Sequence, residues 1–277
     1  MRILSINIIA AFLLLASGAC DMIEGPYLEN PEIVDPGGDE IARNVMIFEF
    51  TGHTCKSCPK AHRTIDQVEQ LYEGRIVTVA FHTGYFARTL SDKYTTDFRT
   101  EQGNEMESYF EFASFPIGLV NNLDKGRLSP YSSWPAEAAA VIQDNAPAEL
   151  FLNTEYLESS GRVNVTINIM NKGRLEGDVR MAVYLVEDGI VSWQKDEDQD
   201  PIDVEDYVHN HVFRTSAGSV WGESILESDC MANANTQKIR SLAMDPAWVP
   251  ENCSVVVFLY DYSGREVIQC EKARVIK

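Results

Sequence analysis

The chain has 277 residues, a length that suits one large domain or two ordinary ones. Its net charge of −19 arises from 42 acidic and 23 basic residues, which argues against nucleic acid as a partner because phosphate binding needs a basic face. Hydrophobic residues make up 45% and charged residues 23%, the mixture of an ordinary globular protein. Nothing in this composition calls for a cofactor, and none is predicted.

Residues 1–19 have the order of an export signal. Arg2 supplies a positive charge, residues 3–16 are mostly apolar, and the small residues 17–19 precede Cys20. The apolar run is shorter than the roughly 20 residues that span a bilayer, so a cleaved signal peptide is predicted rather than a membrane helix.

The residues around Cys20 resemble a bacterial lipobox. In that family of signals, cleavage leaves the cysteine as the first residue, carrying lipid on its sulfur and amine. The usual leucine three positions before the cysteine is Ser17 here, and an ordinary signal peptide cut near Ala19 is the alternative. Residues 20–39 are rich in proline, glycine and acidic residues, which predicts a tether between the membrane and the folded part.

Residues 40–147 are predicted to form a domain in which strands and helices alternate. An apolar strand at 41–50, a helix at 58–71 with apolar residues at helical spacing, and a strand at 75–82 follow one another. This order implies two parallel strands joined by a right-handed crossover. The further predicted elements are a helix at 100–110, a strand at 115–120 and a helix at 135–144.

Two cysteines stand where the loop after the first strand becomes a helix, in the sequence Cys55-Lys56-Ser57-Cys58-Pro59. A Cys-x-x-Cys pair can exchange disulfides, hold a static disulfide or bind a metal. The positive end of a helix favours a thiolate, so Cys55 is predicted as the nucleophile and Cys58 as the resolving thiol. Zinc is disfavoured because no second ligand pair follows, whereas a static structural disulfide stays open.

This region resembles the thioredoxin fold in three features: the motif at 55–59, Glu49 six residues before the first cysteine, and Phe115-Pro116 leading a later strand. The resemblance implies that Glu49 is buried and assists proton transfer from Cys58. It also implies that Pro116 is a cis-proline packed against the redox pair. From the residues alone, Glu49 is equally well explained as an edge-strand charge.

The chain departs from the thioredoxin pattern at three places. Thr54 replaces the usual aromatic residue, Lys56-Ser57 replaces Gly-Pro between the cysteines, and residues 84–105 leave room for an insertion. These departures bring the chain closer to periplasmic, membrane-tethered relatives than to cytosolic thioredoxin. His62, on the predicted helix, is expected to face solvent.

Residues 148–277 are predicted to form an all-β immunoglobulin-like sandwich, because short alternating strands are separated by turns. In 162–170, for example, every second residue is apolar. The predicted strands lie at 149–156, 162–170, 179–187, 207–215, 238–244, 254–260 and 266–276.

Two further patterns in this half suggest metal ligands only weakly. His209 and His211 are expected to share one strand face, but no third ligand is specified. Asp196, Asp198 and Asp200 alternate as in a calcium loop, but the glycine and the closing glutamate of such a loop are missing. No metal is therefore predicted.

Cys230, Cys253 and Cys270 allow at most one disulfide among themselves. A Cys230–Cys253 bridge is one option, because it would brace the connection before the last hairpin. Cys270 then reads as a buried thiol.

The arrangement of lipobox, thioredoxin-like motif and a sandwich containing Tyr207-Val208-His209-Asn210-His211 resembles the outer-membrane-protein-28-related lipoproteins of Bacteroides-type bacteria. The resemblance implies a cell-envelope protein anchored to the outer membrane through lipid on Cys20, on either its periplasmic or its surface face. It implies little about activity.

Two functions are consistent with the sequence. The first is a thiol-disulfide oxidoreductase that acts on protein thiols or disulfides through Cys55 and Cys58, with Glu49 and Pro116 in support. The second is a non-enzymatic surface lipoprotein in which the thioredoxin-like part is a scaffold and the sandwich binds a protein partner.

Overall fold

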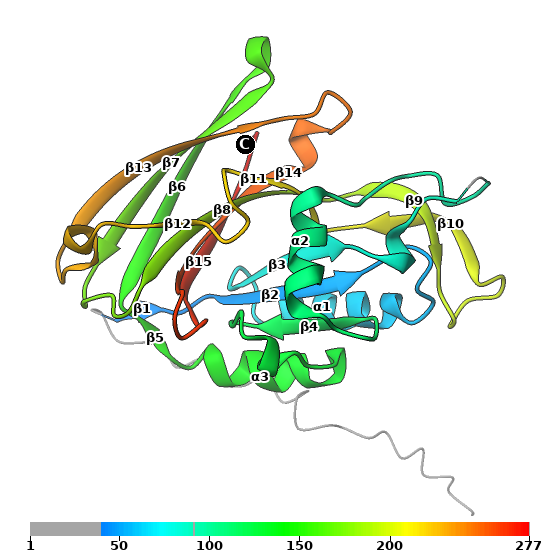
Figure 1. Cartoon of the computed structure of the whole chain (residues 1–277), viewed down its shortest axis with the longest axis horizontal. Coiled ribbons are helices and arrows are strands. Elements are labelled where there is room, and N and C mark those ends of the chain that lie inside the picture. The colour runs from blue at the N-terminus through cyan, green and yellow to red at the C-terminus, as the bar shows by residue number, and fades with distance from the viewer. Residues whose placement is uncertain (1–39, 91, 277) are drawn as a thin grey trace, which may run out of the picture. The chain divides into compact units, whose positions relative to one another are not determined.

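A computed structural model describes residues 40–276 with the exception of residue 91 (Figure 1). The predicted signal peptide, the predicted lipidation site Cys20 and the predicted tether at 20–39 lie outside the described residues. Within the part that the structure describes, no helix combines the length and the apolar character needed to cross a membrane.

The first half of the described chain contains the predicted strand–helix–strand unit. Strand β2 (Val45–Thr51) leads through the cysteine loop into α1 (Cys58–Leu71), and β3 (Ile76–His82) then lies parallel to β2. This confirms the predicted parallel pair. The remaining elements of this half are β1 (Ile41–Ala42), α2 (Glu101–Phe110), β4 (Ile117–Val120), α3 (Trp134–Val141) and β5 (Asn145–Ala146).

Helices cover both faces of this unit, and every side chain of β2 and β3 is therefore buried. Val45 and Ile47 of β2 belong to the core with α1 and α3. Met46, Phe48 and Phe50 point the opposite way, into the core that contains Met106 and Phe110 of α2. Figure 1 shows α2 in front of the sheet and α1 behind it.

The second half of the chain consists of strands joined by loops and short 3₁₀ turns. Its strands are β6 (Ala148–Leu157), β7 (Arg162–Asn171), β8 (Val179–Glu187), β9 (Ile190–Lys195), β10 (Asp203–His209), β11 (Val212–Ser216), β12 (Glu223–Ser224), β13 (Asn235–Ala243), β14 (Cys253–Asp261) and β15 (Val267–Arg274).

One mixed sheet runs through both halves, in the order β15-β14-β8-β11-β3-β2-β4, and β12 pairs with β8. Strand β11 joins the halves: it is parallel to β3, with Val212 opposite Ala80, and antiparallel to β8. Strands from both sides of the predicted boundary at residue 147 thus belong to one sheet (Figure 1).

A second sheet, β13-β7-β6, packs on the part of the mixed sheet formed by β8 and β14. Val255, Val257 and Leu259 of β14 face this second sheet, whereas the residues between them face the core shared with α2. The fold prediction is therefore confirmed in a coarser form: a thioredoxin-like mixed sheet combined with antiparallel sheets.

The structure differs from the prediction at residues 207–215. They form two strands, β10 and β11, separated by a turn in which His211 has φ of 58°. Strand β10 does not belong to the mixed sheet. It forms a hairpin with β9, which the sequence did not predict. His209 ends β10 and His211 lies in the turn, so the expectation that they share one strand face is wrong.

Candidate functional site

The two motif cysteines form a disulfide at the N-terminus of α1. Their Cα atoms are 5.5 Å apart, Cys58 is the first residue of the helix, and Pro59 follows in its first turn. Proline fits there because the amide it lacks has no partner inside a helix. This first turn is the positive end of the helix dipole, which favours a thiolate on the reduced pair.

Both cysteines are buried: Cys55 is 3% exposed and Cys58 is 0% exposed. From the sequence, Cys55 is predicted to be the outer cysteine of the pair. In the structure it is covered by two segments that lie far from it in sequence.

The first covering segment is the hairpin of β9 and β10, residues 190–209, here called the covering hairpin. Its backbone runs along the cysteine loop: the amide of Lys195 donates to the carbonyl of His53 at 2.8 Å, and the amide of Glu197 donates to the carbonyl of Lys56 at 2.9 Å. The buried side chain of Gln194 donates to the carbonyl of Cys55 at 3.0 Å.

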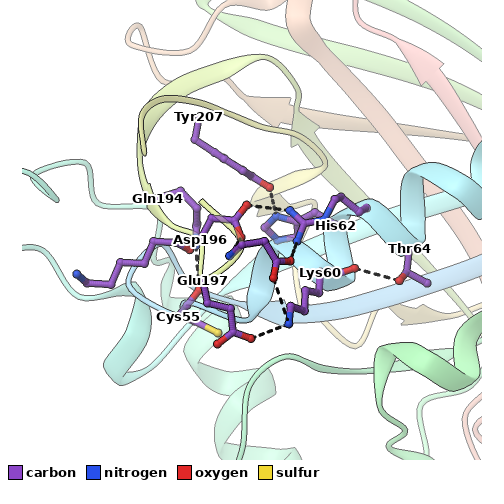
Figure 2. Close-up of polar contacts among 11 residues, drawn as sticks. Cys55, Lys60, His62, Thr64, Gln194, Asp196, Glu197 and Tyr207 are labelled. Atoms are coloured by element: carbon purple, nitrogen blue, oxygen red, sulfur yellow. Dashed lines mark hydrogen bonds and ion pairs between the residues drawn. The ribbon is translucent and has the colours of Figure 1, made fainter. Parts of the chain in front are cut away.

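Opposite charges fasten the covering hairpin to α1. Arg63 donates to Asp196 at 2.8 Å and also to Asp198, and Lys60 lies 2.9 Å from a carboxylate oxygen of Glu197. Figure 2 shows Asp196 and Glu197 reaching down to α1 beside Cys55. Asp196 is buried, with a side chain only 4% exposed, whereas the side chain of Arg63 is 43% exposed, so the bond between them is shielded from solvent on the Asp196 side only.

The second covering segment lies within the predicted insertion. The amide and the hydroxyl of Thr54 both donate to the carbonyl of Phe86, and Nε2 of His53 lies 2.9 Å from the carbonyl oxygen of Arg88. Gly52 permits this approach, because a Cβ atom there would lie 2.5 Å from the carbonyl carbon of Phe86. Burial of His53 lowers its pKa, so this imidazole is neutral at the loop.

We expect Asp196→Asn to speed reduction of the disulfide by a small phosphine roughly tenfold. Losing a charge-assisted hydrogen bond worth about 1.5–3 kcal/mol makes local opening of the covering hairpin easier. Reduction is followed by alkylating the freed thiols over time. Asp200→Asn removes an exposed charge from the same loop and is the matched control. Equal rates for the two variants and the unaltered protein would contradict this role of the hairpin.

Glu49 lies on the β2 face that is turned toward α1 and is 1% exposed. Nε2 of His62 lies 3.2 Å from Oε1 of Glu49 and 3.0 Å from the hydroxyl oxygen of Thr51. Nδ1 of His62 lies 2.6 Å from the hydroxyl oxygen of Tyr207 on the covering hairpin (Figure 2). His62 therefore faces inward, and the expectation that it faces solvent is wrong.

A cavity of about 50 Å³ opens beside this contact, large enough to hold water. Among the side chains that line it are Glu49, His62, Asp66, His82, Tyr207 and His209. Burial places the pKa of His82 well below its usual value and lowers that of His209 to about 3, so both imidazoles are neutral.

The Phe115–Pro116 peptide bond is cis, as the thioredoxin resemblance implied. Phe115 packs on Phe86, with ring centroids 5.4 Å apart, and Phe86 is the residue whose carbonyl accepts from Thr54. The cis-proline strand is thus connected to the cysteine loop through Phe86. The role of Pro116 as an edge for substrate peptides stays a prediction.

The remaining candidate residues are placed as follows. Cys230, Cys253 and Cys270 are buried free thiols in the described chain, so the suggested Cys230–Cys253 bridge is not formed. Cys230 and Cys253 pack as apolar side chains in the core between the two sheets, and burial raises the pKa of Cys253 to about 12. Within residues 40–276 apart from 91, no three histidine, cysteine or acidic side chains are arranged to hold a metal ion.

Sequence reasoning missed three groups at this site: Gln194, the ion pairs of the acidic loop, and the contact of Tyr207 with His62. One signal was available. Lys56 of the cysteine loop and Lys60 and Arg63 of the first turns of α1 follow one another at spacings of four and three residues, and the acidic run 196–200 has the complementary charge. The sequence alone could not show that these distant segments meet.

The chain resembles known proteins in sequence and in fold. The sequence model of the family described as outer membrane protein Omp28 matches residues 103–277. No curated protein sequence matches the chain.

Among solved structures, HBP35 of Porphyromonas gingivalis superposes with a TM-score of 0.65 at 15% identity, over 86% of this chain and 76% of that one. A protein of Agrobacterium tumefaciens superposes with a TM-score of 0.52 at 12% identity, over 85% and 96% of the two chains. At these identities the likeness concerns the fold alone.

Proposed function

The chain belongs to the Omp28 outer membrane protein family, and from this premise we propose that it is an extracytoplasmic thiol-disulfide oxidoreductase anchored to the outer membrane by lipid on Cys20. Cys55 is the nucleophile and Cys58 the resolving thiol. The observation that carries the proposal is the Cys55–Cys58 disulfide at the start of α1, with the buried carboxylate of Glu49 on the adjacent strand.

The exchange proceeds in two steps. A substrate thiolate attacks Sγ of Cys55, the Cys55–Cys58 bond breaks, and Cys58 leaves as a thiolate that takes up a proton. A second substrate thiol, after losing its proton, displaces Cys55. The substrate loses two electrons and forms a disulfide, and the cysteine pair is reduced; the reverse sequence reduces a substrate disulfide.

The covering hairpin sets a condition on this chemistry. In-line attack on a sulfur needs access, and Cys55 is almost fully enclosed. The hairpin must therefore move before a protein substrate reaches Cys55. The local contacts that would break are the backbone bonds of Lys195 and Glu197 and the ion pairs of α1.

The same burial supports a second candidate function. A disulfide enclosed by protein is typical of a structural bond, and in that case the chain is a non-enzymatic surface lipoprotein. The thioredoxin-like part would then be a scaffold, and the antiparallel sheets of the second half would bind a protein partner.

Trapping in cells separates the two functions. We expect Cys58→Ser to accumulate mixed disulfides through Cys55, because the thiol that would release them is missing. Bands that disappear on reduction, and that are absent from the Cys55→Ser, Cys58→Ser double variant, would support the oxidoreductase.

The reduction potential of the unaltered protein provides a second measurement. A value in the range of roughly −120 to −270 mV is that of exchangeable pairs. A potential below about −300 mV, together with no mixed disulfides in cells, would favour the scaffold function instead.

A further inference from the structure

Cys58 and Glu49 are both enclosed, which raises the question of how a proton leaves them. Cys58 must lose a proton before it can attack a mixed disulfide, and it regains one when the disulfide is reduced. With Cys58 at 0% exposure and Glu49 at 1%, neither group exchanges protons directly with bulk solvent. The site therefore needs a route for this proton.

We propose that His62 and Tyr207, which line the same small cavity as Glu49, carry the proton between Glu49 and the water of that cavity. This inference rests on the proposed function, with Glu49 as the group that exchanges a proton with Cys58. His62 and Tyr207 act through Glu49, so they are positioning and relay residues rather than catalytic ones.

The first support is the geometry of His62. Its Nε2 faces Oε1 of Glu49 at 3.2 Å, and its Nδ1 faces the hydroxyl of Tyr207 at 2.6 Å. Nε2 also shares a hydrogen bond with the hydroxyl of Thr51 at 3.0 Å, which holds the ring in place. An imidazole held with a carboxylate beside one nitrogen and a hydroxyl against the other is placed to take a proton on one side and release one on the other. Among the described residues, no group makes a well-aligned hydrogen bond to Oε1 of Glu49, so this oxygen is open to a proton.

The second support is the cavity itself. Both ring nitrogens of His82 are buried, and no described residue offers them a hydrogen bond. Buried polar atoms of this kind are normally satisfied by ordered water, and the cavity has room for it. Asp66, an exposed residue that lines the same cavity, marks where that water meets solvent.

The proton balance of the relay is closed. Protonated Glu49 gives its proton to Nε2 of His62 as Nδ1 gives its own proton to the hydroxyl oxygen of Tyr207. Tyr207 passes its hydroxyl proton to water in the cavity. Glu49 is left ionised and His62 neutral, with its proton now on Nε2.

Burial raises the pKa of Tyr207, so Tyr207 acts as a neutral donor and acceptor and not as a phenolate. Burial also raises the pKa of Asp66. The titratable or charged groups that face the relay from β2, α1, β3, the covering hairpin and the adjoining turn are Glu49, Arg63, Asp66, Glu69, His82, Asp196, His209 and His211.

The test follows the fully reduced protein with a small aromatic disulfide whose thiol product is coloured. Attack by Cys55 releases one equivalent, and resolution by Cys58 releases the second. We expect His62→Gln to slow the second release by about tenfold to a hundredfold and to change its dependence on pH between 5 and 9, since positioned proton transfer contributes at least about a hundredfold in favourable cases. The first release should stay within about twofold of the unaltered protein.

Two variants keep the test decisive. Tyr207→Phe preserves ring packing and removes only the hydroxyl, and it should slow the second release in the same direction. His211→Asn changes another histidine beside the cavity, one that does not contact Glu49, and should leave both releases unchanged. Asparagine tolerates the positive φ at this position.

The inference falls if the second release in His62→Gln and Tyr207→Phe matches the unaltered protein in rate and pH profile. It also falls if the first release is absent, because Cys55 then cannot be attacked at all. Failure of the proposed function is distinct: it would appear as exchange with the small disulfide and none with protein substrates, and the relay would still stand or fall by the second release.

Discussion

Arg214→Ala should lower the free energy of unfolding by about 3–5 kcal/mol, because it leaves a buried charge without its partner. Nε and Nη2 of Arg214 both lie 2.8 Å from Oε2 of Glu187, and the two side chains are 11% and 4% exposed. The other carboxylate oxygen of Glu187 accepts only from the amide of Val249 among the described residues. Urea unfolding followed by circular dichroism measures the loss.

Two controls accompany this prediction. Arg214→Met combined with Glu187→Leu removes both charges and should recover most of the loss, since a buried ion pair is often replaceable by apolar groups. Lys125→Ala breaks an exposed pair with Glu111 and should cost less than about 1 kcal/mol. A loss below about 1 kcal/mol for Arg214→Ala would contradict the importance of the buried pair.

The Arg214–Glu187 pair lies where the two halves of the chain meet in the mixed sheet. Glu187 ends β8 and Arg214 lies on β11, the strand that joins the second half of the chain to β3. Cooperative unfolding of the whole protein is expected if the shared sheet couples the halves. Two separate transitions in Arg214→Ala would show that they unfold independently.

Acidification from pH 7 to pH 5 should destabilise the protein, with His209 alone contributing a loss of about 2 kcal/mol. Burial lowers the pKa of His209 in the folded protein to about 3, whereas an unfolded chain restores it to its usual value of 6.5. Below pH 6.5 the unfolded chain therefore binds a proton that the folded protein refuses, and stability falls as the pH falls toward 3. His82, whose pKa burial lowers well below 6.5, acts in the same direction.

The effect of His209 is isolated by comparing how strongly the stability of two proteins depends on pH. His209→Gln removes its titration, so the stability difference between pH 7 and pH 5 should shrink by about 2 kcal/mol relative to the unaltered protein. Urea unfolding at the two pH values provides both differences. Identical differences for the two proteins would show that His209 is protonated in the folded state, contrary to its burial.

Much of the redox site could be predicted before the fold was known. The apolar strand, the Cys-x-x-Cys pair and the following helix are local features, and each depends on residues close together in sequence. The prediction that Glu49 is buried and that Pro116 is cis depended on family resemblance, and the structure has both. The prediction that His62 faces solvent was wrong because its contacts depend on tertiary structure. Glu49 lies on the neighbouring strand, and Tyr207 is 145 residues further along the chain.

The second half shows where local pattern fails. Residues 207–215 were predicted as one strand, yet the chain turns at Asn210 and His211 and enters a different sheet. Alternation records which side chains are buried, not which neighbour buries them. Strand β9 was missed because its two buried residues are polar: Ser192 bonds to Thr96 and Gln194 to the cysteine loop, rather than packing in a continuous apolar core.

The sequence by itself determined the chemistry available to this protein: two cysteines at a helix start, a carboxylate on the preceding strand, and a predicted export signal to a compartment outside the reducing cytosol. Only the tertiary structure decided how that chemistry is reached. It closed the Cys55–Cys58 pair under the covering hairpin, connected Glu49 through His62 to Tyr207, and joined both halves in one sheet. The reason is physical: bonding geometry at a helix start is set by neighbours in sequence, whereas burial and proton routes are set by segments that meet only when the chain folds.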